Sequence, residues 1–414
     1  MKYAKPRLSA LMFIQTFVLG ATLPIISLYM IGNLGFTGAQ TGLALGLGAV
    51  SSIVSPLFMT FIADRLISSE RLLCLLNLAG GVCMMIFAAQ TEFYPALIMY
   101  VVHSVITNPT LPLIYAITFR HSPAERRKFG NIRVWGTVGW ISVAWIFSFG
   151  ILRDGGGVSA GDGSKLPLLL TISAVTSFIT AAYALTIPRK RDLSGDSGSR
   201  PRFWDAAAFR IILQPRVLAL SVIAAAITFS DKFYHVGTAP FLKYIGFSER
   251  DIMPAMSLGQ IPEIFGMVVL GYLLKRWGVK KVLIAGMVLK VFRFGICAFF
   301  ETDAFLIYTS LSVHGLAYTL TMVTALICLD GFCTDRERSG VHQLFSVITA
   351  GIGGFLGSYA AGWVVDIFTT TCAAGSEVVN YSGFWIVAFV LTVIITAVMW
   401  IAWPKNAGKL KSEG

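Results

Sequence analysis

The sequence has 414 residues, of which 56% are hydrophobic and 13% are charged, with a formal net charge of +12 and a mean hydropathy of +0.73. Soluble domains carry about 25% charged residues, so this composition argues against a water-soluble enzyme. The basic residues lie between apolar runs rather than on one face, which argues against a nucleic-acid partner. Six cysteines form no C-x-x-C pair, so neither a metal site nor a disulfide framework is expected.

Twelve apolar runs are long enough to cross a bilayer, which takes about 20 residues. They cover 8–32, 38–63, 71–90, 94–119, 132–152, 166–188, 217–243, 252–274, 281–300, 304–329, 340–368 and 382–403. The first run lacks a small-residue cleavage site and is expected to be a retained span. Most lysines and arginines fall in the loops on the side of the N-terminus, which predicts that both termini are cytoplasmic.

The longest polar stretch, 189–216, divides the spans six and six. Its small, polar residues predict a cytoplasmic linker between an N-terminal six-helix bundle, 1–188, and a C-terminal bundle with a short cytoplasmic tail, 217–414. The expected fold is therefore an all-α integral membrane protein with twelve transmembrane helices in two six-helix bundles, the layout of the major facilitator superfamily. Glycines in the second and eleventh spans predict close helix packing there.

The fifth span places Arg133, Thr137 and Trp140 on one helical stripe, at i, i+4 and i+7. A cation, a hydroxyl and an indole on one stripe could hold a polar solute that contains a ring. Alternatively, Arg133 reaches the cytoplasmic surface from the helix entry.

The seventh span contains Asp231, Lys232 and His235. Asp231 and His235 are one helical turn apart and could relay a proton. The alternative is a self-neutralised cluster of Asp231 and Lys232 that only fixes the orientation of the helix.

The eighth span places Gln260 and Glu263 on one face, with Pro262 between them weakening the backbone hydrogen bonding. A carboxyl group at this depth must be protonated, paired with a cation or open to a water-filled cavity. We favour a functional role, and the alternative is a structural ion pair with Arg293 or Arg133.

The ninth and tenth spans carry further polar groups. A structural role is favoured for Lys290 and Arg293, which lie on adjacent faces of the ninth span. His314 and Tyr318, at i and i+4, suit either ring stacking with a solute or core packing. Two other residues are weaker candidates: His103, expected to be a satisfied helix contact, and Gln15, a possible pocket residue.

Sequence motifs of enzymes and ATP-driven pumps are absent: there is no GxxxxGK[ST], HExxH or GxSxG. We therefore expect no enzymatic activity, no catalytic residues and no cofactor.

Three blocks, NPTLPLIYAIT in the fourth span, IRVWGT in the fifth and GQIPE in the eighth, resemble the nucleoside:proton symporter family of the major facilitator superfamily. The resemblance implies that Arg133, Thr137 and Trp140 line a nucleoside site. It also implies that Gln260 and Glu263 bind the ribose or base, and that Tyr318 is the corresponding aromatic residue of the tenth span.

The sequence also departs from this family. Thr319 stands where familiar members carry a carboxylate implicated in proton coupling, so coupling must use Glu263 or Asp231, or be absent. Lys232 and His235 stand where the family offers neutral amides, which would favour a more acidic or more oxygen-rich solute.

The sequence thus predicts a monomeric inner-membrane transporter, embedded in the lipid bilayer, that imports nucleosides or similar solutes with protons. A sugar, sugar-acid or drug carrier of the same fold is the first alternative. A membrane sensor or scaffold is the second, and it would have a closed, apolar centre.

Overall fold

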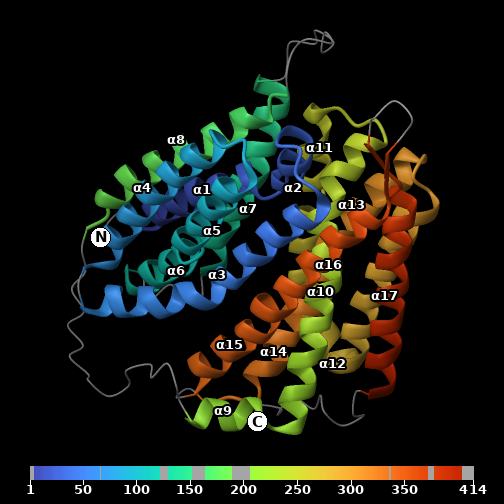
Figure 1. The fold of residues 1–414 in the computed structure, drawn as a ribbon. Helices are drawn as coiled ribbons and strands as arrows, with labels where there is room; N and C mark the ends of the chain where they lie inside the picture. Colours follow the sequence, from blue (N-terminus) through green and yellow to red (C-terminus); the bar gives the residue numbers. More distant parts are fainter. Residues whose placement is uncertain are drawn as a thin grey trace. The chain divides into compact units, whose positions relative to one another are not determined.

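The computed structural model describes residues 4–65, 67–121, 129–151, 164–188, 206–334, 337–371 and 377–402, which are almost entirely helical (Figure 1). The first part of the chain forms α1 (Ala4–Thr22), α2 (Ile26–Leu28), η1 (Tyr29–Asn33), α3 (Gly38–Arg65), α4 (Ser69–Ala88), α5 (Phe93–Thr107), α6 (Thr110–His121), α7 (Phe129–Ile146), η3 (Phe147–Ile151) and α8 (Leu166–Leu185). The second part forms α9 (Ala206–Ile212), α10 (Pro215–Tyr244), α11 (Glu249–Ser257), α12 (Gln260–Phe299), α13 (Ala304–Tyr318), η4 (Thr319–Val323), α14 (Thr324–Asp330), α15 (Arg338–Ser346), η5 (Val347–Gly353), α16 (Gly354–Ile367) and α17 (Tyr381–Ala402). The elements named η are π-helical.

The helices account for the twelve spans that the sequence predicts. Within the described residues, 10 helical runs are long and apolar enough to cross a membrane. One of these runs, Glu249–Phe299, contains 51 residues and supplies two crossings, because Gly278 interrupts α12 with a φ of 76°. The 28-residue α3 covers the predicted second span.

Several spans are interrupted where the sequence analysis expected continuous helices. The fourth is divided into α5 and α6 at Asn108, and the eighth into α11 and α12 between Ser257 and Gln260. The tenth and eleventh pass through the π-helical turns η4 and η5. Such turns are frequent at functional sites, because the extra residue redirects the side chains that follow.

A short antiparallel hairpin is the exception to the predicted all-α structure. Strand β1 (Thr369–Thr371) pairs with β2 (Glu377–Val379), with Thr370 opposite Val378. The linker predicted over 189–216 lies outside the described residues up to 205, and its end contains α9 and the start of α10.

The chain divides into two compact units. Unit 1 comprises Met1–Phe36, Leu47–Gly195 and Leu242–Ser257, and unit 2 comprises Thr37–Gly46, Asp196–Phe241 and Leu258–Gly414. In unit 1, α1 packs against α7 and α8, and α4 packs against α8 and α5. Gly139 permits the first of these contacts, because a Cβ atom there would lie 2.6 Å from Thr16 Oγ1.

In unit 2, α12 packs against α13, η4 and α17. The first residues of α3 belong to this unit and pack on α16 through glycine, as predicted, since a Cβ atom at Gly42 would overlap the carbonyl oxygen of Ser358. Asp366 accepts hydrogen bonds from the backbone N–H groups of Gly38 (2.5 Å) and Ala39 (2.8 Å). A carboxylate at this position satisfies the open amides of the helix and complements its dipole.

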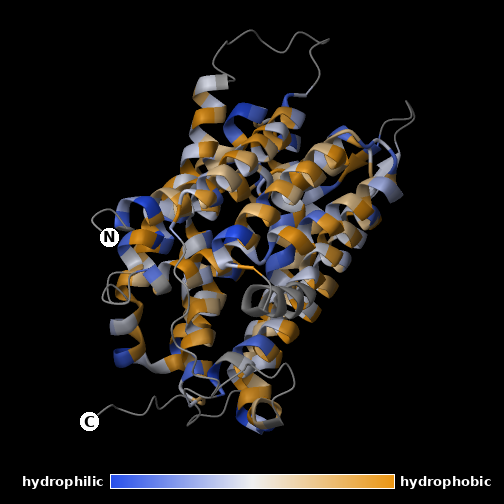
Figure 2. Cartoon of the chain, turned by 90° about the vertical axis from the view of Figure 1, so that its left-hand side faces the viewer, coloured by the Kyte–Doolittle hydropathy of each residue, from blue (hydrophilic) through white to orange (hydrophobic). Residues whose placement is uncertain are grey.

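The surfaces of the long helices are apolar, and Figure 2 shows hydrophobic residues along much of their length. On α17, Ile394 is 54% exposed, Val398 54% and Ile401 81%. An apolar surface of this extent is typical of helices that cross a membrane.

Candidate substrate and proton site

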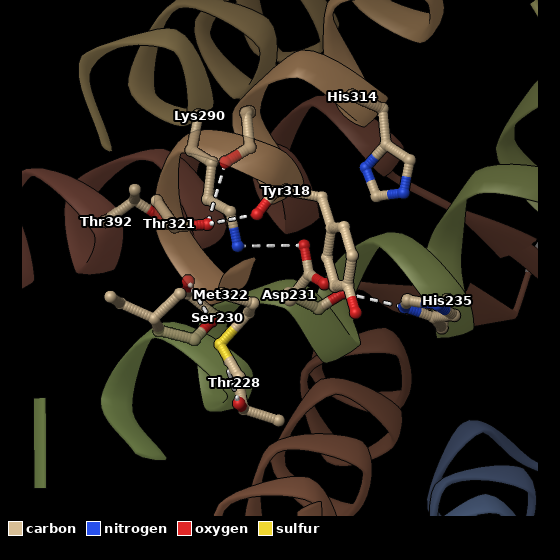
Figure 3. A network of polar contacts seen from close by, with 12 residues as sticks. Thr228, Ser230, Asp231, His235, Lys290, His314, Tyr318, Thr321, Met322 and Thr392 are labelled. Atoms are coloured by element: carbon tan, nitrogen blue, oxygen red, sulfur yellow. Dashed lines mark hydrogen bonds and ion pairs between the residues drawn. The ribbon is translucent and has the colours of Figure 1, made fainter. Parts of the chain in front are cut away.

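A buried ion pair joins α10 to α12 in unit 2. Lys290 Nζ donates a hydrogen bond to Asp231 Oδ1 at 3.0 Å, and the side chains are 0% and 11% exposed (Figure 3). A charge in the apolar core of a membrane protein is costly unless it is paired. Each charge of this pair therefore stabilises the other in the apolar core.

Arg293 lies nearly one helical turn beyond Lys290 and is equally buried, with 1% of its surface exposed. Its Nη1 donates to His314 Nδ1 at 2.5 Å, and its guanidinium carbon lies 4.2 Å from the centre of the Tyr234 ring. Tyr234 in turn stacks on His314, with ring centres 4.0 Å apart. Arg293 thus holds two aromatic rings by a hydrogen bond and a cation–π contact.

Arg293 has no carboxylate partner among the residues that the structure describes, and its Nε is buried without a hydrogen bond. The predicted alternative of an ion pair between Glu263 and Arg293 is therefore wrong. The reason is packing, because α13 brings His314 rather than a carboxylate to the guanidinium group.

The predicted side-chain pairing of Asp231 within the seventh span is not found. His235 Nδ1 contacts the backbone oxygen of Asp231 at 3.0 Å rather than its carboxylate. That carboxylate pairs with Lys290 and not with Lys232, so the self-neutralised Asp231–Lys232 cluster does not form. The side chain of His235 is exposed and that of Lys232 is half-buried in unit 2.

Gln260 and Glu263 lie in the first turn of α12, and both are half-buried. This turn packs closely on α13, because a Cβ atom at Gly315 would lie 2.6 Å from Glu263 Cβ. Tyr318, one turn further along α13, is half-buried. Within unit 2, α10, α12 and α13 therefore bring the predicted residues of the seventh, eighth and tenth spans into one region.

Thr319, which the sequence resemblance aligns with a carboxylate of the family, is fully buried. Its Oγ1 donates to the backbone oxygen of Gly315 at 3.0 Å and lies 3.4 Å from the backbone oxygen of Glu263. Because a threonine hydroxyl does not titrate in the physiological range, this position contributes a helix contact and not a proton site.

The predicted stripe of the fifth span belongs to unit 1. Arg133 is exposed, and Thr137 and Trp140 are half-buried on α7, whereas Gly136 and Gly139 face the core of the unit. The three residues therefore share the less buried side of the helix, as their spacing predicts.

Two weaker candidates lie in unit 1 as well. His103 is buried and contacts the backbone oxygen of Gly80 at 3.0 Å, which agrees with its expected role as a satisfied helix contact. Gln15 is fully buried, and neither its Nε2 nor its Oε1 has a hydrogen bond.

Comparison with known proteins identifies the family. Residues 1–407 match the family described as Nucleoside H+ symporter. The chain belongs to this family. The sequence resemblance and the predicted major facilitator fold are thereby confirmed.

Individual family relatives cover nearly the whole chain. A putative nucleoside transporter, YegT, of Escherichia coli (strain K12) is 27% identical over 412 residues, which cover 98% of this chain and 95% of the relative. A xanthosine permease of the same organism is 26% identical over 386 residues, covering 88% of each chain. The crystal structure of the nucleoside transporter NupG superposes with a TM-score of 0.83 at 21% identity, covering 96% of this chain and 98% of that one, and supports the fold.

Membership of the nucleoside H+ symporter family makes this chain a multi-pass membrane transporter whose family couples nucleoside movement to protons. It favours the nucleoside hypothesis over a sugar, sugar-acid or drug carrier. The sensor or scaffold alternative required a closed, apolar centre, whereas unit 2 contains a buried network of charged and aromatic residues.

Sequence reasoning missed the part played by Tyr234, whose ring lies between Arg293 and His314. The available signal was its position directly before His235, since a tyrosine beside ionisable residues inside a span is a candidate partner for them.

Proposed function

We propose that this chain imports nucleosides together with protons across the inner membrane by alternating access. The chain acts as a monomer in the bilayer, with both termini in the cytoplasm and the two predicted six-helix bundles joined by the linker 189–216. The observation that carries the proposal is the group of polar side chains in unit 2 next to the buried Asp231–Lys290 pair. A transporter of polar solutes needs such groups, and a structural membrane bundle does not.

The nucleoside-binding residues are those implied by the family blocks, together with the polar residues around them. In unit 1 they are Arg133, Thr137 and Trp140, and in unit 2 they are Lys232, His235, Gln260, Glu263, His314 and Tyr318.

Glu263 is the proton carrier in this proposal. Asp231, the other candidate, is paired with Lys290, so its protonation would leave a lysine charge unpaired in the apolar core. Protonation of Glu263 leaves the Asp231–Lys290 pair intact and removes the carboxylate charge from the half-buried first turn of α12. Coupling follows if a nucleoside binds tightly only to the protonated form, because the two then cross together.

Binding by the purified protein tests this assignment. Nucleosides are expected to raise its apparent melting temperature, because a ligand at about 100 times its Kd stabilises the folded state by about 2.7 kcal/mol. Arg133→Ala and Gln260→Ala are expected to abolish the shift, whereas Arg210→Ala, which removes an exposed arginine on α9, is expected to retain it.

The panel includes nucleobases, pentoses, hexoses and sugar acids. A shift produced by sugars or sugar acids alone would contradict the proposed substrate class and would direct attention to Lys232 and His235. A nucleoside shift that survives both alanine variants would contradict the assignment of the two residues.

A further inference from the structure

The contact between Arg293 and His314 fixes which nitrogen of the histidine carries its hydrogen. A guanidinium group has only donors, so His314 Nδ1, at 2.5 Å from Arg293 Nη1, must act as the acceptor. A neutral imidazole with an acceptor at Nδ1 carries its hydrogen at Nε2.

The other edge of His314 is available to a ligand. His314 is half-buried, and no partner among the described residues occupies its Nε2. The stack on Tyr234 and the guanidinium contact hold the ring from two sides. The result is a preoriented N–H donor.

This donor lies beside the residues proposed to contact the nucleoside. His314 directly precedes Gly315, which packs against Glu263, and a Cβ atom at Gly259 would lie 3.6 Å from His314 Cβ. His235, whose side chain is exposed, lies 6.3 Å away between ring centres. His314 therefore lies beside the first turn of α12, which carries Gln260 and Glu263.

The charges near His314 also favour a ligand that presents an oxygen atom. The segments 231–235, 260–263 and 290–293 of unit 2 contain three cationic side chains and two carboxyl groups: Lys232, Lys290 and Arg293, with Asp231 and Glu263. Asp231 is already paired with Lys290, and among the described residues the Arg293 side chain contacts His314 and the rings of Tyr234 and Phe294. An electron-rich oxygen is stabilised in such surroundings, whereas an amino group with partial positive charge is not.

We infer that His314, held in its Nε2–H form by Arg293, is a specificity residue that selects nucleosides with a carbonyl oxygen on the base over those with an amino group at that position. Six-oxopurine nucleosides and uridine carry the oxygen, and adenosine and cytidine carry the amino group. A donor facing an amino group leaves both unpaired. The inference rests on the proposed function, because it assumes that nucleosides are the substrates.

Competing uptake of inosine and adenosine into proteoliposomes that contain the full chain tests the inference, since the two differ only in the group at position 6 and in the hydrogen that inosine carries at N1. The wild type is expected to prefer inosine by about tenfold, which is the effect of one hydrogen bond that contributes about 1.4 kcal/mol. His314→Phe keeps the stack on Tyr234 but removes the donor, so the preference is expected to fall to about one. The wild type is likewise expected to prefer uridine to cytidine, and His314→Phe is expected to remove this preference.

Two further variants test whether the uptake ratio depends on the hydrogen at Nε2 of His314. Arg293→Met frees His314 to exchange its hydrogen between the two nitrogens, so adenosine uptake is expected to gain relative to inosine uptake. His342→Phe is the matched control, because His342 contacts Asp330 at the end of α14 and should not change the ratio.

The outcomes distinguish this inference from the proposed function. Saturable nucleoside uptake with equal rates for inosine and adenosine, or a preference that persists in His314→Phe, would overturn the inference and leave the proposed function intact. Absence of saturable uptake for every nucleoside would overturn the proposed function and the inference together.

Discussion

Glu263→Gln is expected to abolish proton-driven accumulation of nucleosides while leaving nucleoside exchange across the membrane intact. Glutamine retains the size and hydrogen-bonding capacity of the protonated acid but cannot release a proton. For one proton per nucleoside, each unit of pH difference supports about tenfold accumulation, since both correspond to about 1.4 kcal/mol. The variant should therefore only equilibrate its substrate.

Proteoliposomes loaded at different internal pH provide the measurement, with counterflow of labelled nucleoside as the readout of exchange. Glu377→Gln, in the exposed strand β2, is the control for removal of a carboxyl group. Accumulation that persists in Glu263→Gln with unchanged pH dependence would remove Glu263 from the mechanism. If Asp231→Asn alone gave the uncoupled behaviour, Asp231 would be the proton carrier instead.

Lys290→Met is expected to have the largest effect on stability. It leaves the carboxylate of Asp231 buried without its cation, and breaking a buried pair from one side costs about 3–5 kcal/mol. Asp231→Asn leaves the amine unpaired and is expected to be similarly harmful. The double variant Asp231→Asn with Lys290→Met leaves neither charge and is expected to recover most of the loss.

The wild type, the two single variants and the double variant form a double-mutant cycle. Their stabilities are measured as apparent melting temperatures in detergent. Lys232→Met, at the residue next to Asp231, is the matched control, because its amine makes no ion pair with the described carboxylates. A Lys290→Met protein as stable as the wild type would contradict the assignment of the pair as a buried structural contact.

Most of the fold could be predicted from the sequence because the thickness of the bilayer fixes the length of each apolar run. The interruptions within the spans could not. Asn108 with Pro109 carried a visible signal, but the π-helical turns that begin at Thr319 and Val347 depend on packing between helices. Hydropathy alone does not register one extra residue in a helical turn.

The candidate site could be predicted only within single helices. Helical spacing correctly placed Arg133, Thr137 and Trp140 on one side of α7. It paired Asp231 with residues of its own helix, whereas its partner is Lys290, which lies 59 residues further along the chain. Contacts of this kind depend on which helices pack together, and a single sequence does not contain that information.

Simultaneous recording of proton entry and nucleoside entry is the most direct test of the central claim that this chain is a nucleoside:proton symporter. Wild-type protein is reconstituted into vesicles that contain a pH-sensitive dye, and a labelled nucleoside is added without any imposed gradient. Acidification of the interior in step with nucleoside uptake, absent with sugars, is the predicted result. Nucleoside entry without a change in internal pH would contradict proton coupling, and no nucleoside entry at all would contradict the assigned substrate.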